Sequence, residues 1–219
     1  MPFSPRAIIF DFDYTLADSS SGVIACVNYA LAELGLPTEP PERIRRTIGM
    51  SLLATLVELK GSTRSHLAAK FQRLFTACAD DVMADQTTLY PWVPDLLAAL
   101  AARGITMGIV STKYRRRLEA VLQREGLLSR FAVIVGGDDV THPMPAPDAL
   151  LRAVEILRVP PAGVLYVGDS VADGEAAQAA GMPFVAVRSG VTPLRSLEAL
   201  SPAATLDDAS ALVALLEPT

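Results

Sequence analysis

The sequence has few of the side chains that build disulfide frameworks or thiolate and imidazole metal sites. Its 219 residues include two cysteines and two histidines. Cys26 and Cys78 are too few and too far apart in the sequence to suggest a metal site or a set of disulfide bonds. We therefore expect two reduced thiols that are buried or half-buried. We also expect His66 and His142 to be ordinary surface and loop residues.

An excess of positive charge is missing as well. The formal net charge of −5 supplies no field that would attract nucleic acid or an anionic membrane. No apolar run reaches about 18 residues, and the first residues lack the pattern of a signal peptide. We expect a cytoplasmic monomer or homodimer without nucleic-acid or membrane partners, and any anion must be bound by a local site.

Apolar residues make up 51% of the chain, enough for one large domain or for a core domain with an insertion. From residue 91 onward, short apolar runs alternate with segments of helical periodicity. Buried strands that are each followed by a helix predict an α/β fold with a doubly wound, Rossmann-like parallel sheet covered on both faces. The predicted strands lie in segments 105–111, 131–137, 163–169 and 183–189, and the helices in 93–104, 114–126, 146–158 and 171–181.

The first strand, "AIIFDF", is followed by a long segment without another strand-like run. A parallel crossover needs about a dozen residues, and residues 93–103 already provide its helix. The intervening chain has helical periodicity instead. We therefore predict a core domain of residues 1–17 and 91–219, and an inserted helical domain of residues 18–90 that acts as a hinged lid.

Polar side chains follow four of the predicted strands. Ligands of open parallel sheets bind beyond the carboxyl ends of the strands, so we expect these side chains to converge there. They are Asp11 and Asp13; Ser111, Thr112 and Lys113; Asp138 and Asp139; and Asp169, Ser170 and Asp173.

The aspartates predict a cation site. Asp11 and Asp13 are two residues apart on an extended segment, so their side chains start on one face. If Asp169 joins them, these carboxylates raise each other's pKa or bind a cation, and Mg²⁺ suits such oxygen ligands. A metal, a carboxylate nucleophile and nearby hydroxyl groups are what phosphoryl transfer requires. The alternative is that these aspartates only cap helices.

Three segments resemble motifs of a known family. "FDFDYTLADS", "GIVSTK" and "GDSVADGEAAQAAG" resemble motifs I, II and IV of the haloacid dehalogenase (HAD) superfamily. The helical insertion resembles the C1 cap of that superfamily. The resemblance covers nearly the whole chain and is greatest to the phosphoglycolate phosphatase branch.

This resemblance implies Mg²⁺-dependent hydrolysis of a small phosphorylated metabolite through an aspartyl-phosphate. Asp11 would be the nucleophile and Asp13 the general acid and base. Asp11, Asp169 and the carbonyl oxygen of Asp13 would bind Mg²⁺. The supporting roles are phosphoryl binding by Ser111, the Thr112 N–H and Lys113, and support of the metal site by Ser170 and Asp173.

Position 144 departs from the family pattern, because methionine stands where motif III normally has lysine. That lysine neutralises the nucleophile and the phosphoryl oxygens, which methionine cannot do. Three explanations stay open: an introduced substitution that traps substrate, a natural residue replaced in its role by another cation, or a non-catalytic descendant. We expect weakened turnover with the fold and the Mg²⁺ site retained. The candidate replacement cations are Lys113, Arg115, Arg116 and Arg117, although the arginines also suit a solvated helix face.

A second departure is Tyr14, where glycine is usual, which we interpret as a tolerated variant. Alternative functions are a pyrophosphatase, a β-phosphoglucomutase-like phosphotransferase, and a catalytically weak phosphate-binding protein. A haloacid dehalogenase is disfavoured, because it needs neither Mg²⁺ nor an acid/base at Asp13.

Overall fold

The computed structural model describes residues 3–216, which divide into two compact units. One unit contains the described parts of residues 1–17 and 89–219, and the other contains residues 18–88. No helix in residues 3–216 is long and apolar enough to cross a membrane.

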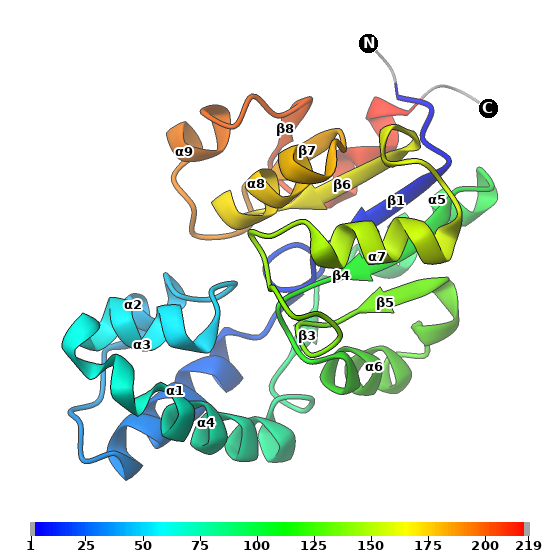
Figure 1. The fold of residues 1–219 in the computed structure, drawn as a ribbon. Coiled ribbons are helices and arrows are strands. Elements are labelled where there is room, and N and C mark those ends of the chain that lie inside the picture. Colours follow the sequence, from blue (N-terminus) through cyan, green and yellow to red (C-terminus); the bar gives the residue numbers. More distant parts are fainter. Residues whose placement is uncertain (1–2, 217–219) are drawn as a thin grey trace. The chain divides into compact units, whose positions relative to one another are not determined.

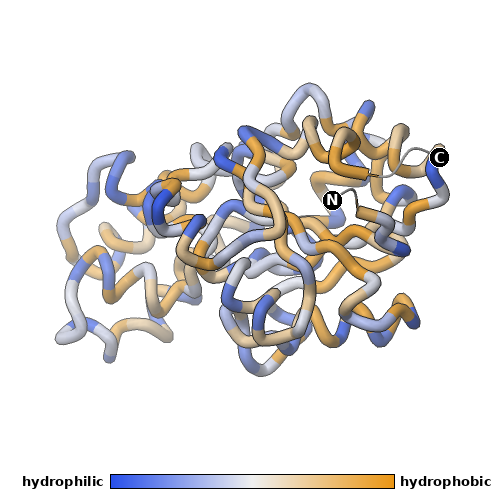
Figure 2. Tube along the Cα trace, turned by 90° about the horizontal axis from the view of Figure 1, so that it is seen from above, coloured by the Kyte–Doolittle hydropathy of each residue, from blue (hydrophilic) through white to orange (hydrophobic). Residues whose placement is uncertain are grey.

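The larger unit is built on a parallel sheet that has six strands within the described chain, in the order β5-β4-β1-β6-β7-β8 (Figure 1). The strand bounds are β1 Ala7–Phe10, β4 Thr106–Val110, β5 Val133–Val135, β6 Val164–Gly168, β7 Phe184–Val187 and β8 Ala204–Leu206. The four residues of β1 are fully buried, which explains its central place. Figure 2 colours the chain by hydropathy and shows runs of hydrophobic residues along it. The predicted α/β fold is confirmed. Among these six strands, β8 has no counterpart among the predicted strands.

The register of the central strands aligns their carboxyl ends. Phe10 pairs with Ile109 of β4 and with Val167 of β6. The chain therefore leaves all three strands at nearly the same level, one or two residues before Asp11, Ser111 and Asp169. Parallel pairing thus brings together segments that are far apart in the sequence.

Helices cover the sheet. Their bounds are α5 Val93–Ala102, α6 Arg115–Arg124, α7 Asp148–Leu157, α8 Val171–Ala180 and α9 Leu194–Glu198, with 3₁₀ helices η2 Leu128–Arg130, η3 Pro161–Gly163 and η4 Ala209–Leu215. The helices α7 and α8 pack against each other and share a core that includes Ile9, Leu150 and Tyr166. Helix α5 packs against β4 and η4, and α6 packs against β5 and η2. Right-handed crossovers, the rule for parallel strands, would put α5 and α6 on the face opposite to α7 and α8.

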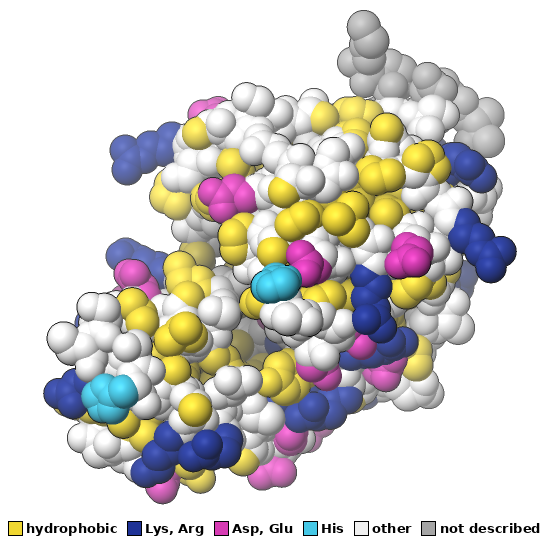
Figure 3. Space-filling view, viewed as in Figure 1, with side chains coloured by type: hydrophobic (Ala, Val, Ile, Leu, Met, Phe, Trp, Pro, Cys, Tyr) yellow, Lys and Arg dark blue, Asp and Glu magenta, His cyan; other side chains and the backbone are white. Residues whose placement is uncertain are grey.

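Helix α7 is amphipathic. Leu150 and Ala153 face the core, whereas Leu151 and Ile156 are 42% and 51% exposed. Figure 3 shows hydrophobic side chains at the surface over this helix. The helical spacing of buried positions explains why residues 146–158 carry the pattern of a helix rather than of another strand.

The smaller unit is helical. Its elements are α1 Ser20–Glu33, α2 Pro41–Arg45, α3 Leu52–Lys60, η1 Ser62–Leu67 and α4 Ala68–Val82, and the short strands β2 Ala17–Asp18 and β3 Thr88–Leu89 pair where the chain passes between the units. Its own core contains Cys26, Leu31, Leu56 and Phe71. Cys26 is buried and Cys78 is half-buried, as predicted. That this unit works as a lid stays a prediction.

Candidate active site

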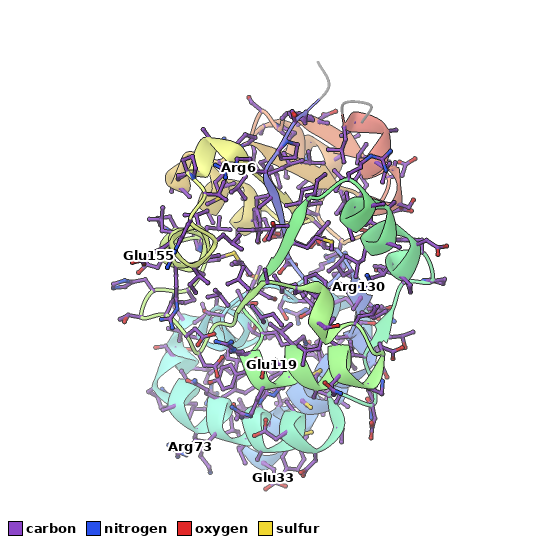
Figure 4. All side chains as sticks on the ribbon, turned by 90° about the vertical axis from the view of Figure 1, so that its right-hand side faces the viewer. Arg6, Glu33, Arg73, Glu119, Arg130 and Glu155 are labelled. Atoms are coloured by element: carbon purple, nitrogen blue, oxygen red, sulfur yellow. The ribbon has the colours of Figure 1, made fainter. Side chains whose placement is uncertain are left out.

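Three buried carboxylates lie together beyond the carboxyl ends of β1 and β6. Asp11 follows β1, Asp169 follows β6, and Asp173 belongs to the first turn of α8. Each offers a carboxylate oxygen within 4.8 Å of the other two, and the residues are only 6%, 5% and 1% exposed. Arg6, before β1, is exposed and is labelled in Figure 4. Negative charge is therefore buried at one end of this strand, whereas a charge at its other end is solvated.

Burial and mutual repulsion disfavour the ionised forms of these carboxyls. Burial raises the pKa of Asp11 well above its usual range, and the charges of Asp173, Asp169 and Asp13 raise it further. The pKa of Asp169 is raised well above its usual range by burial and then by Asp173 and Asp13. Such a group is stabilised by bound protons or by a cation. Because all its donors are carboxylate oxygens, the residues present fit a hard divalent ion such as Mg²⁺.

Asp173 is fixed by hydrogen bonds from several sides. Its Oδ2 accepts hydrogen bonds from the Ser170 backbone N at 2.9 Å and from Ser170 Oγ at 2.6 Å. Ser170 Oγ in turn accepts from the Asp173 backbone N at 3.2 Å, which completes a capping box at the start of α8. The Tyr166 hydroxyl donates to Asp173 Oδ1 at 2.7 Å. Burial raises the pKa of Asp173, and these hydrogen bonds lower it.

A glycine makes room for this carboxylate. A Cβ at position 168 would lie 2.5 Å from Asp173 Cγ, so a larger residue there would displace it. Asp173 therefore both caps α8 and belongs to the carboxylate group. The helix-capping alternative is correct for this residue, but capping does not account for Asp11 and Asp169.

Asp13 lies beside this group and pairs with a lysine. Its Oδ2 is 3.2 Å from Lys113 Nζ, and the two side chains are 9% and 5% exposed. Lys113 belongs to the segment after β4, where its backbone N donates to Ser111 Oγ at 3.4 Å. Ser111 is buried and its own backbone N donates to the Val135 carbonyl. The segments after β1 and β4 thus meet at a buried ion pair next to the carboxylates.

Comparison with known proteins decides the family. The sequence model of the family of haloacid dehalogenase-like hydrolases matches residues 8–187 of this chain. This chain belongs to the haloacid dehalogenase-like hydrolases. The phosphoglycolate phosphatase of Escherichia coli strain K12 is 34% identical to it over 206 residues, which cover 84% of this chain and 82% of that protein.

Solved structures agree with this membership. A protein from Bacteroides fragilis, assigned as a haloacid dehalogenase-like hydrolase, has a TM-score of 0.91 and 37% identity, covering 95% of this chain and all of that one. A protein from Lactobacillus plantarum, assigned as a phosphoglycolate phosphatase, has a TM-score of 0.84 and 29% identity, covering 98% of this chain and 100% of that one. The chain is thus a phosphatase of the haloacid dehalogenase-like hydrolases.

In this hydrolase Met144 belongs to the hydrophobic core of the larger unit. It is 8% exposed, and the same cluster contains Val110, Val135 and Tyr166. The Met144 sulfur lies 3.5 Å from the Tyr166 hydroxyl, the same hydroxyl that donates to Asp173. Position 144 therefore contributes an apolar contact where the family pattern places a positive charge.

The turn after Asp13 forms although tyrosine stands at position 14, where glycine is usual in the family. Tyr14 has a φ of 62°, in the left-handed region that favours glycine. The backbone N–H groups of Leu16 and Ala17 donate to the Phe12 carbonyl at 2.9 and 3.0 Å and close the turn. Tyrosine thus adopts the backbone conformation for which glycine is usual.

Two aspartates expected at the site have structural roles instead. Asp138 Oδ1 accepts a hydrogen bond from the Arg115 backbone N at the start of α6, at 2.8 Å. Asp139 Oδ2 accepts from the Gly136 backbone N at 2.9 Å. These two hydrogen bonds hold the loop after β5 and the start of α6. The carboxylates of Asp138 and Asp139 thus accept hydrogen bonds from nearby backbone N–H groups.

The prediction of a solvated face for the three consecutive arginines at the start of α6 is wrong for one of them. Arg117 is 7% exposed, with its guanidinium 4.8 Å from the centre of the Tyr114 ring. Arg115 and Arg116 are exposed, and Arg115 pairs with Glu119 at 2.8 Å. Successive helix positions point in different directions, and position 117 is the one that turns inward.

Sequence reasoning missed Tyr166 as a site residue. It lies inside β6 and is fully buried, so its ring matches the apolar pattern of the strand. The only signal was a single hydroxyl in an otherwise apolar strand, three residues before Asp169. A buried tyrosine hydroxyl needs a hydrogen-bond partner, and here that partner is Asp173.

Proposed function

We propose that this hydrolase releases phosphate from a small phosphomonoester of the phosphoglycolate type, with Mg²⁺ and through an aspartyl-phosphate. The observation that carries the proposal is the buried carboxylate group of Asp11, Asp169 and Asp173 beside Asp13. The curated relatives at 33–34% identity named phosphoglycolate phosphatase support the choice of substrate class.

Asp11 is the proposed nucleophile. One of its carboxylate oxygens attacks phosphorus, and the bond between phosphorus and the leaving-group oxygen breaks. Asp13 protonates the departing alkoxide. Asp13 then takes a proton from a water molecule that attacks phosphorus, which breaks the bond to Asp11 and releases inorganic phosphate.

Asp11, Asp169 and the backbone carbonyl of Asp13 would hold Mg²⁺, with Asp173 and Ser170 in support. When bound, the ion supplies positive charge that stabilises the phosphoryl oxygens. The fit rests on the donors themselves: carboxylate oxygens within 4.8 Å of one another whose raised pKa values reflect mutual repulsion. A cation relieves that repulsion.

Ser111, the Thr112 N–H and Lys113 would bind the transferring phosphoryl group. Lys113 is the cation that the structure supports best in place of the family lysine, because its ammonium is buried and lies 3.2 Å from Asp13 Oδ2. Arg115 and Arg116 are exposed, and Arg115 pairs with Glu119. The cytoplasmic location and the monomeric or dimeric state stay predictions.

The proposal is tested by incubating the purified chain with Mg²⁺ and three substrates: 2-phosphoglycolate, pyrophosphate and β-glucose 1-phosphate. We expect inorganic phosphate from 2-phosphoglycolate, with the release abolished by EDTA. Preference for pyrophosphate would identify a pyrophosphatase, and conversion of the sugar phosphate without phosphate release would identify a mutase. Phosphate binding without turnover of any substrate would identify a binding protein and overturn the proposal.

A further inference from the structure

Two consecutive residues after β7, Ser189 and Gly190, contact two different parts of the carboxylate site. Neither is charged, and neither belongs to the motifs after β1, β4 or β6. Gly190 abuts the Asp169 carboxylate, and Ser189 hydrogen-bonds the turn after Asp13. We propose that this pair is a positioning element, which sets the place of the metal-binding Asp169 carboxylate relative to the turn that carries Asp13.

The contact at Gly190 leaves no room for a side chain. A Cβ at this position would lie 1.8 Å from Asp169 Oδ2, 2.7 Å from Cγ and 3.0 Å from Cβ. The clash involves the whole carboxylate arm, so a small shift of one oxygen would not relieve it. Asp169 is 5% exposed, which limits the directions in which it can rotate. Any side chain at 190 must therefore displace the carboxylate from the group it forms with Asp11 and Asp173.

The contact at Ser189 holds the turn after Asp13. Ser189 Oγ donates a hydrogen bond to the Tyr14 carbonyl oxygen at 2.5 Å. Tyr14 is the residue with positive φ directly after Asp13, so the hydrogen bond fixes a turn that tyrosine adopts less readily than glycine. One short segment thus determines the distance between the backbone after β1 and the carboxylate after β6.

This inference rests on the proposed Mg²⁺ site, and metal binding without substrate tests it. Mn²⁺ is the probe, and its free concentration is measured by electron paramagnetic resonance during titration of the full chain. Residues that orient metal ligands typically change affinity by 10- to 100-fold, so Gly190→Ala should raise the Kd for Mn²⁺ by roughly that factor. Gly163→Ala is the matched control. It adds the same methyl group at the amino end of β6, where the nearest atom is Val159 Cγ1 at 3.2 Å, and should leave the Kd unchanged.

Ser189→Ala is the second variant, because it removes the hydrogen bond without adding bulk. It should raise the Kd about threefold or more. Circular dichroism of each metal-free variant shows whether it is folded. If Gly190→Ala does not fold, the Kd of Ser189→Ala for Mn²⁺ decides alone: a raised Kd supports the inference, and an unchanged Kd overturns it. Wild-type affinity in both folded variants, or no Mn²⁺ binding by the wild type, would overturn the inference. A wild type that binds Mn²⁺ but hydrolyses no phosphomonoester would refute the proposed function and leave the inference standing.

Discussion

At the scale of single residues, charge is concentrated where the protein is least able to solvate it. Asp11, Asp169 and Asp173 are almost fully buried, and beside them Lys113 pairs with Asp13. Burying several like charges destabilises a protein unless protons or cations compensate them. The burial of these carboxyls thus costs stability, which is what the proposed binding of an ion would offset.

Met144→Lys should increase phosphatase activity. A lysine here would place its ammonium near the Tyr166 hydroxyl, which now contacts the methionine sulfur at 3.5 Å, and so close to Asp173. One preorganised donor in such a site contributes on the order of 10²- to 10³-fold in rate, which bounds the gain in kcat/KM. The measurement is steady-state phosphate release by the variant and the wild type.

The matched control is Leu151→Lys, which adds the same charge to the exposed side of α7. It should leave kcat/KM unchanged. Unchanged activity in Met144→Lys as well would show that position 144 is not where a cation is missing, and would favour Lys113 as a sufficient replacement.

At the scale of elements, the apolar strands and their polar ends could be predicted because burial on both faces leaves an unmistakable pattern. β8 escaped because Ala204–Leu206 is short and only partly buried. Within the insertion predicted to be helical, residues Ser62–Leu67 form the 3₁₀ helix η1, and α4 starts at Ala68. For Tyr166 the local signal was a single hydroxyl in an apolar strand, which does not identify Asp173 as its partner. The contact of Gly190 with Asp169 joins two different strand ends, so no local pattern could indicate it.

Ser170→Ala should affect both stability and the metal site, because the capping box of α8 contains a member of the carboxylate group. Loss of the Ser170 side chain removes an N-cap, which costs about 1 kcal/mol in the free energy of unfolding, and frees Asp173 Oδ2 from the hydroxyl at 2.6 Å. We expect lower stability in chemical denaturation and weaker activation by Mg²⁺.

Ser51→Ala is the matched control, since Ser51 caps α3 through a bond from the Ala54 backbone N. It should lose a similar amount of stability while its Mg²⁺ activation stays at the wild-type level. Equal Mg²⁺ activation in both variants would show that the α8 capping box does not support the metal site.

At the scale of the whole molecule, the carboxylate group makes stability depend on pH and on metal. The pKa values of Asp11 and Asp169 are raised in the folded protein, so the stability they contribute is present below the ordinary carboxyl pKa of about 4 and is lost as pH rises through their folded values. Without metal, Asp11→Asn should therefore raise the Tm at neutral pH more than at about pH 5.

Thermal unfolding in EDTA at the two pH values measures this difference. Mg²⁺ should stabilise the wild type increasingly as pH rises, since the proposed site binds it through ionised carboxylates. A gain in Tm from Asp11→Asn that is the same at both pH values would show that Asp11 is not under the repulsion described above.

The most direct test of the account is to trap the covalent intermediate. The wild type is mixed with Mg²⁺ and 2-phosphoglycolate, quenched during turnover and treated with borohydride, which reduces an acyl phosphate to an alcohol. Mass spectrometry should then find homoserine at position 11, and no such product without substrate or in Asp11→Asn. Phosphate release at the wild-type rate by Asp11→Asn, or a trapped adduct at a residue other than Asp11, would contradict the account.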